Sequence, residues 1–566
     1  MENKKLIECV PNFSEGRDMS IIKQITDAIE TVDGVRLIDV DPGKATNRTV
    51  VTIVGTPDEV CEAAFRAAKK ASEIIDMSKH SGAHPRFGAT DVCPLVPVSN
   101  ITMEEVVQYA RKLAKRIGEE LQIPVYCYEY AASEEKRRNL ANCRSGEYEG
   151  LPKKLQDPNW KPDFGPSKFN PRTGAIAVGA RNFLIAYNVN LNTTSTRRAN
   201  AVAFDIREKG RPVRVGNQVT GKIALDEKGN ELWIPGSLKA CKALGWFIEE
   251  YGIAQVSINL TDITVTPMHI AFEESSAKAM ERGLRVTGSE LVGVVPLQAM
   301  IDAGKYFLNK QQRSTGISER EIIKIAIKSM GLDELTPFDP DKKIIEYILR
   351  DSSKKKLIDL SLEAFALETA SESPAPGGGS ISASMGAFGV ALGTMVANLS
   401  AHKPGWDDRW KEFSDWADKG KFYMEQLIKL VDEDTNAFNK IMDAFGLPKS
   451  NDEEKTVRKN AIQVATLYAT EVPFKVMHLC FESMEVIKAM AEFGNPNSVT
   501  DAGVGALAAR SGVMGAFLNV KINASGLEDK TVVEKFLKEG ENIVKKTIEL
   551  ESAILTIVEN KISGRK

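Results

Sequence analysis

The spacing of hydrophobic positions changes once along the chain and divides it into two parts. Up to about residue 330, short β-branched stretches alternate with longer stretches in which apolar residues recur every three or four positions. Strands and helices produce these two periodicities, so the first part is predicted to be α/β. The predicted strands include 6–10, 35–40, 49–54, 183–189, 256–260 and 291–296. The predicted helices include 21–29, 57–75, 195–208 and 267–282.

This first part is predicted to contain two α/β subdomains, residues 1–182 and 183–330, because a second set of strands and helices begins near residue 182. Strands that are joined through helices require crossover connections. We therefore expect parallel strand pairs in each sheet, with antiparallel neighbours possible, so that both subdomains have mixed sheets.

The second part, from residue 356 to residue 566, has helical periodicity almost throughout. The segment before it, 331–355, is charged and contains Pro337 and Pro340, which interrupt regular elements. We predict a linker at 331–355 and an all-α helical bundle at 356–566. The predicted helices of this bundle are 356–370, 379–400, 406–445, 452–492, 500–517 and 530–560.

Residues 373–401 contain no Asp, Glu, Lys or Arg and therefore resemble a membrane span. The stretch begins with Pro, Ala and Gly residues and is rich in Ser and other small residues, which leaves too few strongly apolar positions for a span. Gly386, Gly389 and Gly393 recur at helical spacing, which favours close packing between buried helices. We expect no membrane interaction.

Composition excludes several classes of function. The 566 residues are 43% hydrophobic and 27% charged, which is typical of a folded globular protein. Lys and Arg number 74 against 77 Asp and Glu, so the net charge of -3 argues against nucleic-acid binding by overall phosphate neutralisation. A local basic groove for a small polyanion stays open.

The cysteines indicate a reducing compartment. There are seven, an odd number, and no two are arranged as C-x-x-C. This argues against a disulfide framework and against a structural zinc site. The first residues show no apolar segment of an export signal, so we expect a cytoplasmic protein.

Two of the five histidines, His80 and His84, lie in a stretch rich in Gly, Pro and polar residues at 79–91, which is predicted to be a loop. Loops on a rigid sheet commonly carry functional groups, and an imidazole can accept and return a proton near neutral pH. The alternative is that His84, which precedes Pro85, only fixes a turn. A zinc site is less favoured because no third ligand lies nearby at metal-site spacing, and we predict no metal.

Polar residues near the second predicted strand are further candidates. Asp39 and Asp41 are predicted to end this strand, where carboxyl ends commonly face a ligand crevice, or they form a turn with Pro42. Arg48 follows and is either a clamp for a carboxylate or a surface cation.

Several ordered segments together resemble the glutamate formimidoyltransferase family. They are CVPNFSEG at 9–16, DVD at 39–41, TNRTV at 46–50, HPRFGA at 84–89 and DFGPS at 163–167. Over residues 5–560 the chain resembles the bifunctional formimidoyltransferase-cyclodeaminase family of histidine degradation. One stretch, 209–238, is longer than we expect for vertebrate members and contains a hairpin-like turn at 225–230.

The resemblance implies that the first half transfers the formimidoyl group of N-formimidoyl-L-glutamate to N5 of tetrahydrofolate and releases glutamate. It assigns the catalytic acid and base to His84, supported by Asp41, and makes tetrahydrofolate a co-substrate. Asn12 and Arg48 are added as candidate binding residues. The family's folate-contacting loop corresponds to Gly165, Pro166, Ser167, Lys168, Phe169, Asn170, Pro171, Arg172, Thr173 and Gly174. Without the resemblance, this stretch reads as an irregular connector.

In the helical half, Asp434 lies on an apolar stripe formed by Leu427, Val431, Phe438, Ile441 and Phe445. It is therefore predicted to point inward, where burial raises the pKa of a carboxyl group, whereas Asp432 points elsewhere. The family's catalytic aspartate also corresponds to Asp434. The alternative is a buried aspartate that only bonds the backbone.

The resemblance implies that this half closes 5-formimidoyltetrahydrofolate to 5,10-methenyltetrahydrofolate and releases ammonia. It rests on APGGGS at 375–380, on LVDED at 430–434 and on the tail at 497–523. The glycine run precedes a helix and is either a site for an anionic ligand or a flexible helix start. Further candidates for the pocket are Asn497, Ser498, Asp501, Asn519 and Asn523.

Two alternatives stay open. The helical half is a methenyltetrahydrofolate cyclohydrolase in one, and the whole chain is an inactive folate-binding scaffold in the other. The resemblance also implies a homo-oligomer, a ring of dimers up to an octamer.

Overall fold

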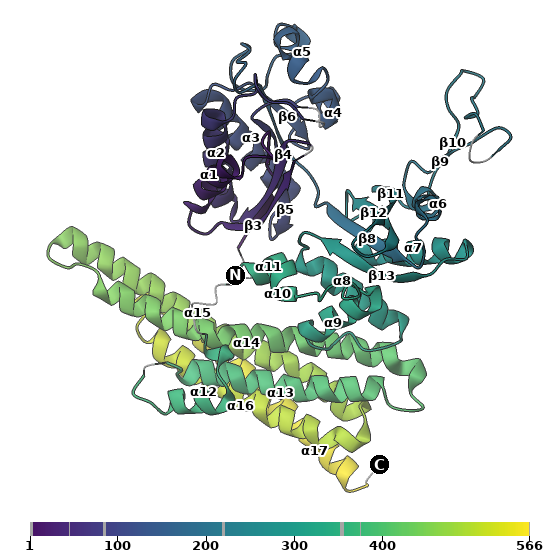
Figure 1. The fold of residues 1–566 in the computed structure, drawn as a ribbon. Coiled ribbons are helices and arrows are strands. Elements are labelled where there is room, and N and C mark those ends of the chain that lie inside the picture. The colour runs from purple at the N-terminus through teal and green to yellow at the C-terminus, as the bar shows by residue number, and fades with distance from the viewer. Residues whose placement is uncertain are drawn as a thin grey trace. The chain divides into compact units, whose positions relative to one another are not determined.

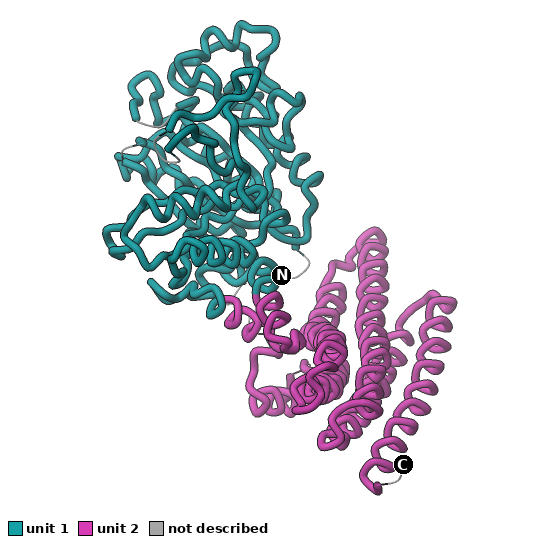
Figure 2. Tube along the Cα trace, turned by 90° about the vertical axis from the view of Figure 1, so that its right-hand side faces the viewer, with its two compact units in different colours: residues 1–303, 327–350 teal, residues 304–326, 351–566 magenta. Residues whose placement is uncertain are grey.

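The computed structural model describes residues 4–44, 46–82, 86–217, 221–350, 356–373 and 375–564. The chain divides into two compact units (Figure 2). The first unit comprises residues 1–303 and 327–350, and the second comprises residues 304–326 and 351–566. Sheets with helices make up the first unit and helices make up the second, which confirms the predicted fold class.

The first unit begins with a seven-stranded mixed sheet (Figure 1). Its strands are β1 (Leu6–Cys9), β2 (Asn12–Phe13), β3 (Arg36–Gly43), β4 (Arg48–Gly55), β5 (Thr90–Ser99), β6 (Val125–Glu129) and β7 (Ile176–Ala180). β1 and β2 follow one another between β4 and β5, and β3 lies at the outer edge of β4. β7 runs parallel to both β5 and β6, and the other pairs are antiparallel. The predicted parallel pairs are confirmed in this sheet.

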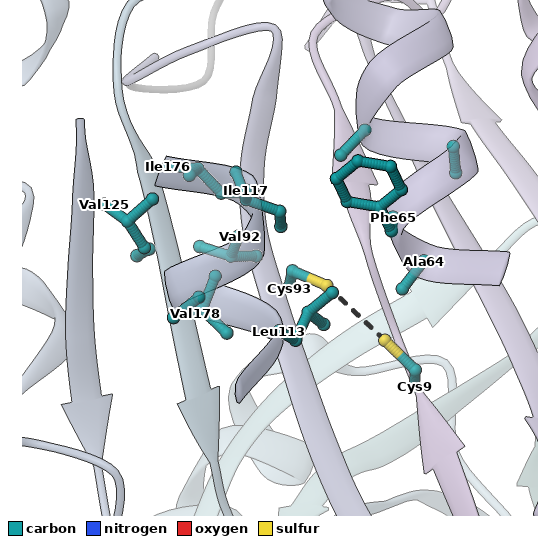
Figure 3. Close-up of a cluster of buried hydrophobic side chains, with 14 of the residues drawn as sticks. Cys9, Ala64, Phe65, Val92, Cys93, Leu113, Ile117, Val125, Ile176 and Val178 are labelled. Atoms are coloured by element: carbon teal, nitrogen blue, oxygen red, sulfur yellow. Dashed lines mark hydrogen bonds between the residues drawn. The ribbon is translucent and has the colours of Figure 1, made fainter. Parts of the chain in front are cut away.

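Three helices pack on one face of this sheet: α1 (Met19–Glu30), α2 (Pro57–Ile74) and α3 (Met103–Glu120) (Figure 1). Thr102 caps the N-terminus of α3: its side chain accepts a hydrogen bond from the Glu105 backbone N–H, while the Glu105 carboxylate accepts one from the Thr102 N–H. The buried core between helices and sheet contains Phe65, Leu113 and the thiols of Cys9 and Cys93, whose sulfurs lie 3.6 Å apart (Figure 3). Since side chains alternate along a strand, polar residues next to these core positions project from the opposite face.

The second sheet has the strand order β11–β12–β8–β13, and every neighbouring pair is antiparallel. The prediction of parallel pairs is therefore wrong for this sheet. Helix α6 joins β8 to β11, but β12 lies between these two strands; α7 joins β12 to β13, but β8 lies between them. The elements are β8 (Ile185–Leu191), α6 (Thr196–Ile206), β11 (Cys241–Ile248), β12 (Ile253–Leu260), α7 (Met268–Glu281) and β13 (Val286–Val292).

The long stretch at 209–238 forms a small two-stranded sheet of β9 (Arg211–Pro212) and β10 (Trp233–Ile234) that extends from the subdomain (Figure 1). Its described part contains a turn in which the Asp226 N–H donates to the Asn230 carbonyl at 2.8 Å. Gly229 adopts a left-handed φ of 82° in this turn. The hairpin-like turn predicted at 225–230 is confirmed.

The segment between the sheets and the helical bundle is shared between the two units. Residues 304–326, from α8 (Leu297–Lys310) and α9 (Glu319–Met330), belong to the second unit, where the Thr315 N–H donates to Ser414 Oγ at 3.1 Å. Residues 327–350 belong to the first unit and contain α10 (Pro340–Lys343) and α11 (Ile345–Ile348). The part of the expected linker up to residue 350 is thus folded onto the first unit.

The second unit is a bundle of long helices (Figure 1). They are α13 (Gly378–Ala401), α14 (Trp410–Gly446), α15 (Asp452–Phe493), α16 (Val499–Ala524) and α17 (Lys530–Ile562), preceded by the short α12 (Leu362–Thr369). Small residues bring α13 and α16 together, as predicted: a Cβ on Gly389 would lie 2.8 Å from the Gly505 carbonyl oxygen. Residues 378–401 and 496–524 are long and apolar enough to cross a membrane, but 61% and 50% of their most apolar windows are buried inside the protein. Such burial is typical of the core helices of a bundle.

Two candidate active sites

The polar face of the first sheet carries a cluster of ion-paired and hydrogen-bonded side chains. We call it the Asp91 cluster, and its members are Asn12, Arg48, Asp91 and Arg144. Asp91 is 1% exposed, and its Oδ2 lies 2.8 Å from Arg48 Nη1 and 3.0 Å from Arg144 Nη2. Arg48 Nε also donates to Asn12 Oδ1 at 3.2 Å. Burial lowers the pKa of Arg48 and the neighbouring Asp91 carboxylate opposes this, so the guanidinium stays charged.

A local irregularity of β5 aims Asp91 into this cluster. Asn12 lies opposite Val92 and Phe13 lies opposite Thr90, so Asp91 is an extra residue on its strand. Such a bulge redirects a side chain that strict alternation would place elsewhere. The structure thus brings together the predicted residues Asn12 and Arg48 with Asp91 and Arg144, to which no role was assigned from the sequence.

His84 lies outside the described residues, together with Ala83 and Pro85. The residues before it rest on the turn between β3 and β4: the His80 ring bonds the Asn47 carbonyl at 2.8 Å, and Asn47 Nδ2 donates to the Ser81 carbonyl at 2.9 Å. A Cβ on Gly82 would lie 2.1 Å from the Thr46 carbonyl oxygen, so this contact requires glycine. The assignment of His84 stays a prediction.

Arg86 holds the other side of the same loop. Its guanidinium donates to the carbonyls of Met77 and His80 and pairs with Glu149 on α5 (Glu147–Lys154), with 2.6 Å between Arg86 Nη2 and Glu149 Oε1. It also lies over the ring of Tyr148, whose backbone N–H donates to the Arg86 carbonyl at 2.7 Å. The loop that contains His84 is therefore anchored to α5.

Asp39 and Asp41 lie inside β3, so the prediction that they end a strand is wrong. The strand continues to Gly43 as the outer edge of an antiparallel pair with β4. Asp41 is exposed and lies opposite Val50, which in turn lies opposite Asn12. Two strand spacings, about 10 Å, thus separate the backbones of Asp41 and Asn12, and both side chains project from the polar face. The supporting role of Asp41 stays a prediction.

The predicted folate-contacting loop, residues 165–174, joins the same end of the sheet. Gly174 forms a bridge with Gly88, and the Met77 N–H donates to the Arg172 carbonyl at 3.0 Å. The Phe169 ring packs against Tyr148 with 5.5 Å between ring centroids. The loop is thereby joined to both flanks of the His84 loop.

This loop offers one buried hydroxyl and several exposed residues to a ligand. Thr173 is buried, and its hydroxyl finds no hydrogen-bond partner within the described part of the chain; the same holds for the hydroxyl of Thr90 at the start of β5. A buried hydroxyl without a partner costs free energy, which a ligand atom would recover. The exposed residues of the loop are Gly165, Ser167, Lys168, Asn170, Pro171 and Arg172, and Pro166 is half-buried.

In the second unit, Asp434 on α14 meets the beginning of α13. Its Oδ2 accepts hydrogen bonds from the Ser380 backbone N–H at 2.9 Å and from Ser380 Oγ at 3.2 Å. Burial raises the pKa of Asp434, and the bonds from Ser380 partly oppose this rise. The inward orientation predicted for Asp434 agrees with these contacts.

Asp432 points to a different segment from Asp434, as predicted, but it too is hydrogen-bonded within the protein. It is half-buried and accepts a hydrogen bond from the Leu357 N–H at 2.7 Å, and burial raises its pKa as well. The apolar stripe used in the prediction is buried only in its first half: Phe438 and Phe445 are 37% and 49% exposed, whereas Ala437 and Ala444 are buried. The two aspartates therefore contact different segments, and neither is an ordinary surface carboxylate.

The other predicted pocket residues separate into two groups. Asn519 lies at the glycine run, since a Cβ on Gly378 would be 3.0 Å from its Nδ2, and Asn523 Nδ2 donates to the Ala469 carbonyl at 2.7 Å. Asp501 lies at the other end of α16, about 27 Å from Asn519 at 1.5 Å per helical residue. Asn497 and Ser498 precede Asp501, so these three residues lie toward the opposite end of α16 from Asn519.

The comparisons with known proteins follow the two units. Residues 6–181 match the formiminotransferase domain, N-terminal subdomain; residues 186–350 match the formiminotransferase domain; and residues 361–542 match formiminotransferase-cyclodeaminase. The chain is 42% identical over 532 residues to the formimidoyltransferase-cyclodeaminase of Mus musculus, covering 94% of each protein. The chain belongs to the formimidoyltransferase-cyclodeaminase family. The predicted family and its bifunctional enzyme class are confirmed.

Two further relatives each match one half of this chain. The glutamate formimidoyltransferase of Thermoplasma acidophilum is 43% identical over 324 residues, which are 57% of this chain and 98% of that protein. The methenyltetrahydrofolate cyclohydrolase of Methylorubrum extorquens is 37% identical over 203 residues, which are 36% of this chain and 98% of that protein. Each half thus resembles a protein that is complete without the other.

The described residues contain no group of three or more His, Cys, Asp or Glu side chains that is arranged to hold a metal ion. The expectation that no metal takes part stays a prediction. Asp91 and Arg144 were missed from the sequence because neither belongs to a motif whose spacing indicates chemistry. Pairing of β2, β4 and β5 places Asp91 beside Arg48, and Arg144 reaches Asp91 from the turn at 142–145, which lies outside these strands.

Proposed function

We propose that this chain transfers the formimidoyl group of N-formimidoyl-L-glutamate to N5 of tetrahydrofolate, and then closes 5-formimidoyltetrahydrofolate to 5,10-methenyltetrahydrofolate with release of ammonia. The observation that carries this proposal is the match over 94% of the chain to a formimidoyltransferase-cyclodeaminase, with both halves matched in the same order. The two candidate sites lie in different compact units, which supports two separate catalytic steps.

In the transferase, the Asp91 cluster is suited to bind the glutamate moiety. Arg48 and Arg144 place two guanidinium groups beside one buried carboxylate, and a guanidinium binds a substrate carboxylate with paired hydrogen bonds. The 165–174 loop, in which the Thr173 hydroxyl has no hydrogen-bond partner among the described residues, is suited to contact the folate.

The chemical step requires a proton to leave N5 and a proton to reach the departing glutamate nitrogen. One imidazole performs both transfers if it lies between the two nitrogens, and His84 is the residue to which the family resemblance assigns this role. Asp41 on the polar face of the sheet supports the imidazolium electrostatically in this proposal.

In the helical unit, Asp434 serves as the proton donor to the departing ammonia. Its raised pKa keeps a larger fraction of the carboxyl group protonated than at an exposed site. The Ser380 N–H and hydroxyl fix the carboxyl oxygen, and the beginning of α13 supplies a positive field toward an anionic ligand. Tetrahydrofolate is the co-substrate of the first step, and its 5-formimidoyl derivative is the substrate of the second.

The cyclohydrolase of Methylorubrum extorquens supports a second candidate function for the helical unit, hydrolysis of the methenyl compound. The two functions are separated by incubating the purified protein with N-formimidoyl-L-glutamate and tetrahydrofolate while recording glutamate, ammonia and methenyl-folate absorbance together. Equal release of glutamate and ammonia with a stable methenyl signal is expected. A methenyl compound that is consumed when supplied alone would favour the cyclohydrolase, and no glutamate release would reject the transferase.

A cytoplasmic location and a homo-oligomer belong to the same proposal. All seven cysteines are free, and Cys9 and Cys93 lie side by side without a disulfide bond, which supports a reducing compartment. α13 and α16 expose large apolar side chains, which supports association of copies into the ring-like octamer of the family. These side chains are Met385, Phe388, Met395, Leu399, Val504, Leu507, Met514, Leu518 and Ile522. Light scattering during size-exclusion chromatography measures the number of copies.

A further inference from the structure

A buried lysine on α5 contacts the turn that presents Arg144. Lys154 is 7% exposed, and its Nζ donates to the backbone carbonyls of Asn142 at 3.0 Å and Ser145 at 3.2 Å, and also to that of Cys143. It further bonds Ser145 Oγ at 3.2 Å and lies 4.1 Å from the centroid of the Trp160 ring. Burying a cation costs free energy unless it is bonded, so these contacts fix the ammonium and the turn relative to each other.

The turn that Lys154 bonds contacts the candidate site in two places. Arg144 lies between Cys143 and Ser145, whose carbonyls accept hydrogen bonds from Lys154, and the Arg144 guanidinium pairs with Asp91. The helix that follows the turn bonds Arg86 through the Tyr148 N–H and the Glu149 carboxylate. The same short segment thus joins the Asp91 cluster to the loop that contains His84.

We propose that Lys154 is a positioning residue for formimidoyl transfer: it holds the turn at 142–145 so that Arg144 is aimed at the glutamate moiety of the substrate. This inference rests on the proposed transferase function. Within the described residues, every hydrogen bond of Lys154 Nζ goes to residues of this turn, so we expect its removal to act through Arg144. The affinity for N-formimidoyl-L-glutamate should then suffer more than the chemical step.

The surroundings of Lys154 add a dependence on pH. Burial, helped by the nearby Arg137 guanidinium and opposed by the Cys143 thiol, lowers the pKa of Lys154 to about 8. Tyr126 on β6 is a further titratable group near it, 5.6 Å from Nζ to the ring centroid. Above this pKa the amine loses one N–H donor and its charge, so its hydrogen bonds to the three carbonyls weaken.

This weakening is distinct from unfolding. The pKa of Lys154 is lower in the folded protein than its ordinary value of 10.5, so between these two pH values the unfolded chain binds more protons. The contribution of Lys154 to the free energy of unfolding therefore rises over this range. A loss of substrate affinity above about pH 8 would not come from loss of folding at this residue.

The test combines Lys154→Met with Arg144→Met in a double-mutant cycle. Lys154→Met keeps an unbranched side chain but removes the charge and the donors, and we expect the KM for N-formimidoyl-L-glutamate to rise at least about tenfold. In the Arg144→Met background the same change should have little further effect, because the two residues act in series. An unchanged KM, or two losses that simply multiply, would overturn the proposal.

Lys136→Met is the matched control. Lys136 also bonds a backbone carbonyl, that of Asn159 at 2.7 Å, and lies near the Trp160 ring, but its amine does not grip the turn at 142–145. Its KM should stay at the wild-type value. Ammonia release from supplied 5-formimidoyltetrahydrofolate reports in every variant that the helical unit is intact.

If Lys154→Met is recovered unfolded, the test is made by measuring the pH dependence of KM in the wild-type protein. Its KM for N-formimidoyl-L-glutamate should rise from pH 8 to pH 9.5, and this rise should be absent in Arg144→Met. A profile of the same shape in both proteins overturns the positioning role while glutamate release still upholds the transferase. Absence of glutamate release from the wild type would reject both.

Discussion

Gly379 and Asp434 fit together so closely that a single methyl group would not fit between them. A Cβ at position 379 would lie 2.1 Å from Asp434 Oδ1, well inside van der Waals contact. The glycine run at the start of α13 is thus explained by the carboxyl group that it receives.

Gly379→Ala should displace the Asp434 carboxyl group and break its bonds to Ser380. We expect ammonia release from 5-formimidoyltetrahydrofolate to fall at least about a hundredfold, because a catalytic group shifted by about 1 Å loses that much. Gly446→Ala on α14 is the control, since a Cβ there meets nothing within 4 Å. Wild-type ammonia release from Gly379→Ala would show that the contact has no catalytic role.

Asp434→Asn and Asp432→Asn separate the two aspartates. Asp434→Asn keeps the volume but removes the titrating proton, so ammonia release should be lost while glutamate release continues and 5-formimidoyltetrahydrofolate accumulates. Asp432→Asn should retain most of the activity, because Asp432 bonds the Leu357 N–H and lies away from the glycine run. A larger loss in the Asp432 variant rejects the assignment, and equal losses indicate a coupled pair.

The pH profile of the second step tests the same carboxyl group independently. The pKa of Asp434 is raised by burial, so its protonated form persists to higher pH than that of an exposed aspartate. Because the proton donor is the protonated form, kcat for ammonia release should fall as pH rises through this raised pKa. Asp434→Asn should lack this limb of the profile, and an identical limb in the variant would contradict the role.

His84→Ala should reduce glutamate release by about a hundredfold to ten-thousandfold, the usual contribution of a general acid and base. Ammonia release from supplied 5-formimidoyltetrahydrofolate should stay near the wild-type rate, since that site lies in the other unit. His80→Ala is the control from the same loop; it removes a bond to the Asn47 carbonyl and should cost less. Near wild-type glutamate release from His84→Ala would reject the assignment.

A fragment of residues 1–350 should fold and retain the transferase, whereas a fragment of residues 1–330 should melt at a lower temperature or aggregate. The shorter fragment lacks five buried apolar side chains, each of which contributes about 1.5–3 kcal/mol. They are Leu332, Ile344, Ile345, Tyr347 and Leu349. It also lacks Glu334, whose carboxylate accepts a hydrogen bond from Asn190 at 2.6 Å. Thermal melting and glutamate release compare the fragments, and equal melting temperatures would show that 331–350 is dispensable.

Local periodicity predicted the elements of this chain well but not all of their partners. The long helices at 406–445 and 452–492 were recognised because apolar residues repeat over many turns. The antiparallel pairing of the second sheet was not predicted. It arises because each helical crossover connects two strands that have another strand between them, and no local signal in the sequence encodes that arrangement.

The candidate sites show the same limit. Asp434 was found because a carboxyl group on an apolar stripe is unusual, although the buried face beyond it belongs to Ala437 and Ala444 instead of Phe438 and Phe445. Arg144 was missed because its role depends on a contact with Asp91, more than fifty residues away in the sequence. Lys154 was missed because its contact with Asn142 spans more than ten residues, and no motif spacing reveals either contact.

The Asp91 cluster yields a last prediction in which stability and binding separate. Asp91→Asn leaves the guanidinium groups of Arg48 and Arg144 without their shared carboxylate, so the free energy of unfolding should fall by about 3 kcal/mol, and the KM for N-formimidoyl-L-glutamate should rise. Arg48→Lys keeps the charge but cannot bond Asp91 and Asn12 through a planar fork, so it should raise this KM about tenfold with a smaller loss of stability.

Asp205→Asn is the matched control, because Asp205 also lies between two arginines, Arg211 and Arg282, but in the second subdomain and with more exposure. It should lower the melting temperature slightly and leave the KM unchanged. Denaturant unfolding and glutamate release, measured on the same preparations, decide the matter: a KM that rises equally in the Asp205 and Asp91 variants would mean that the Asp91 cluster affects only folding.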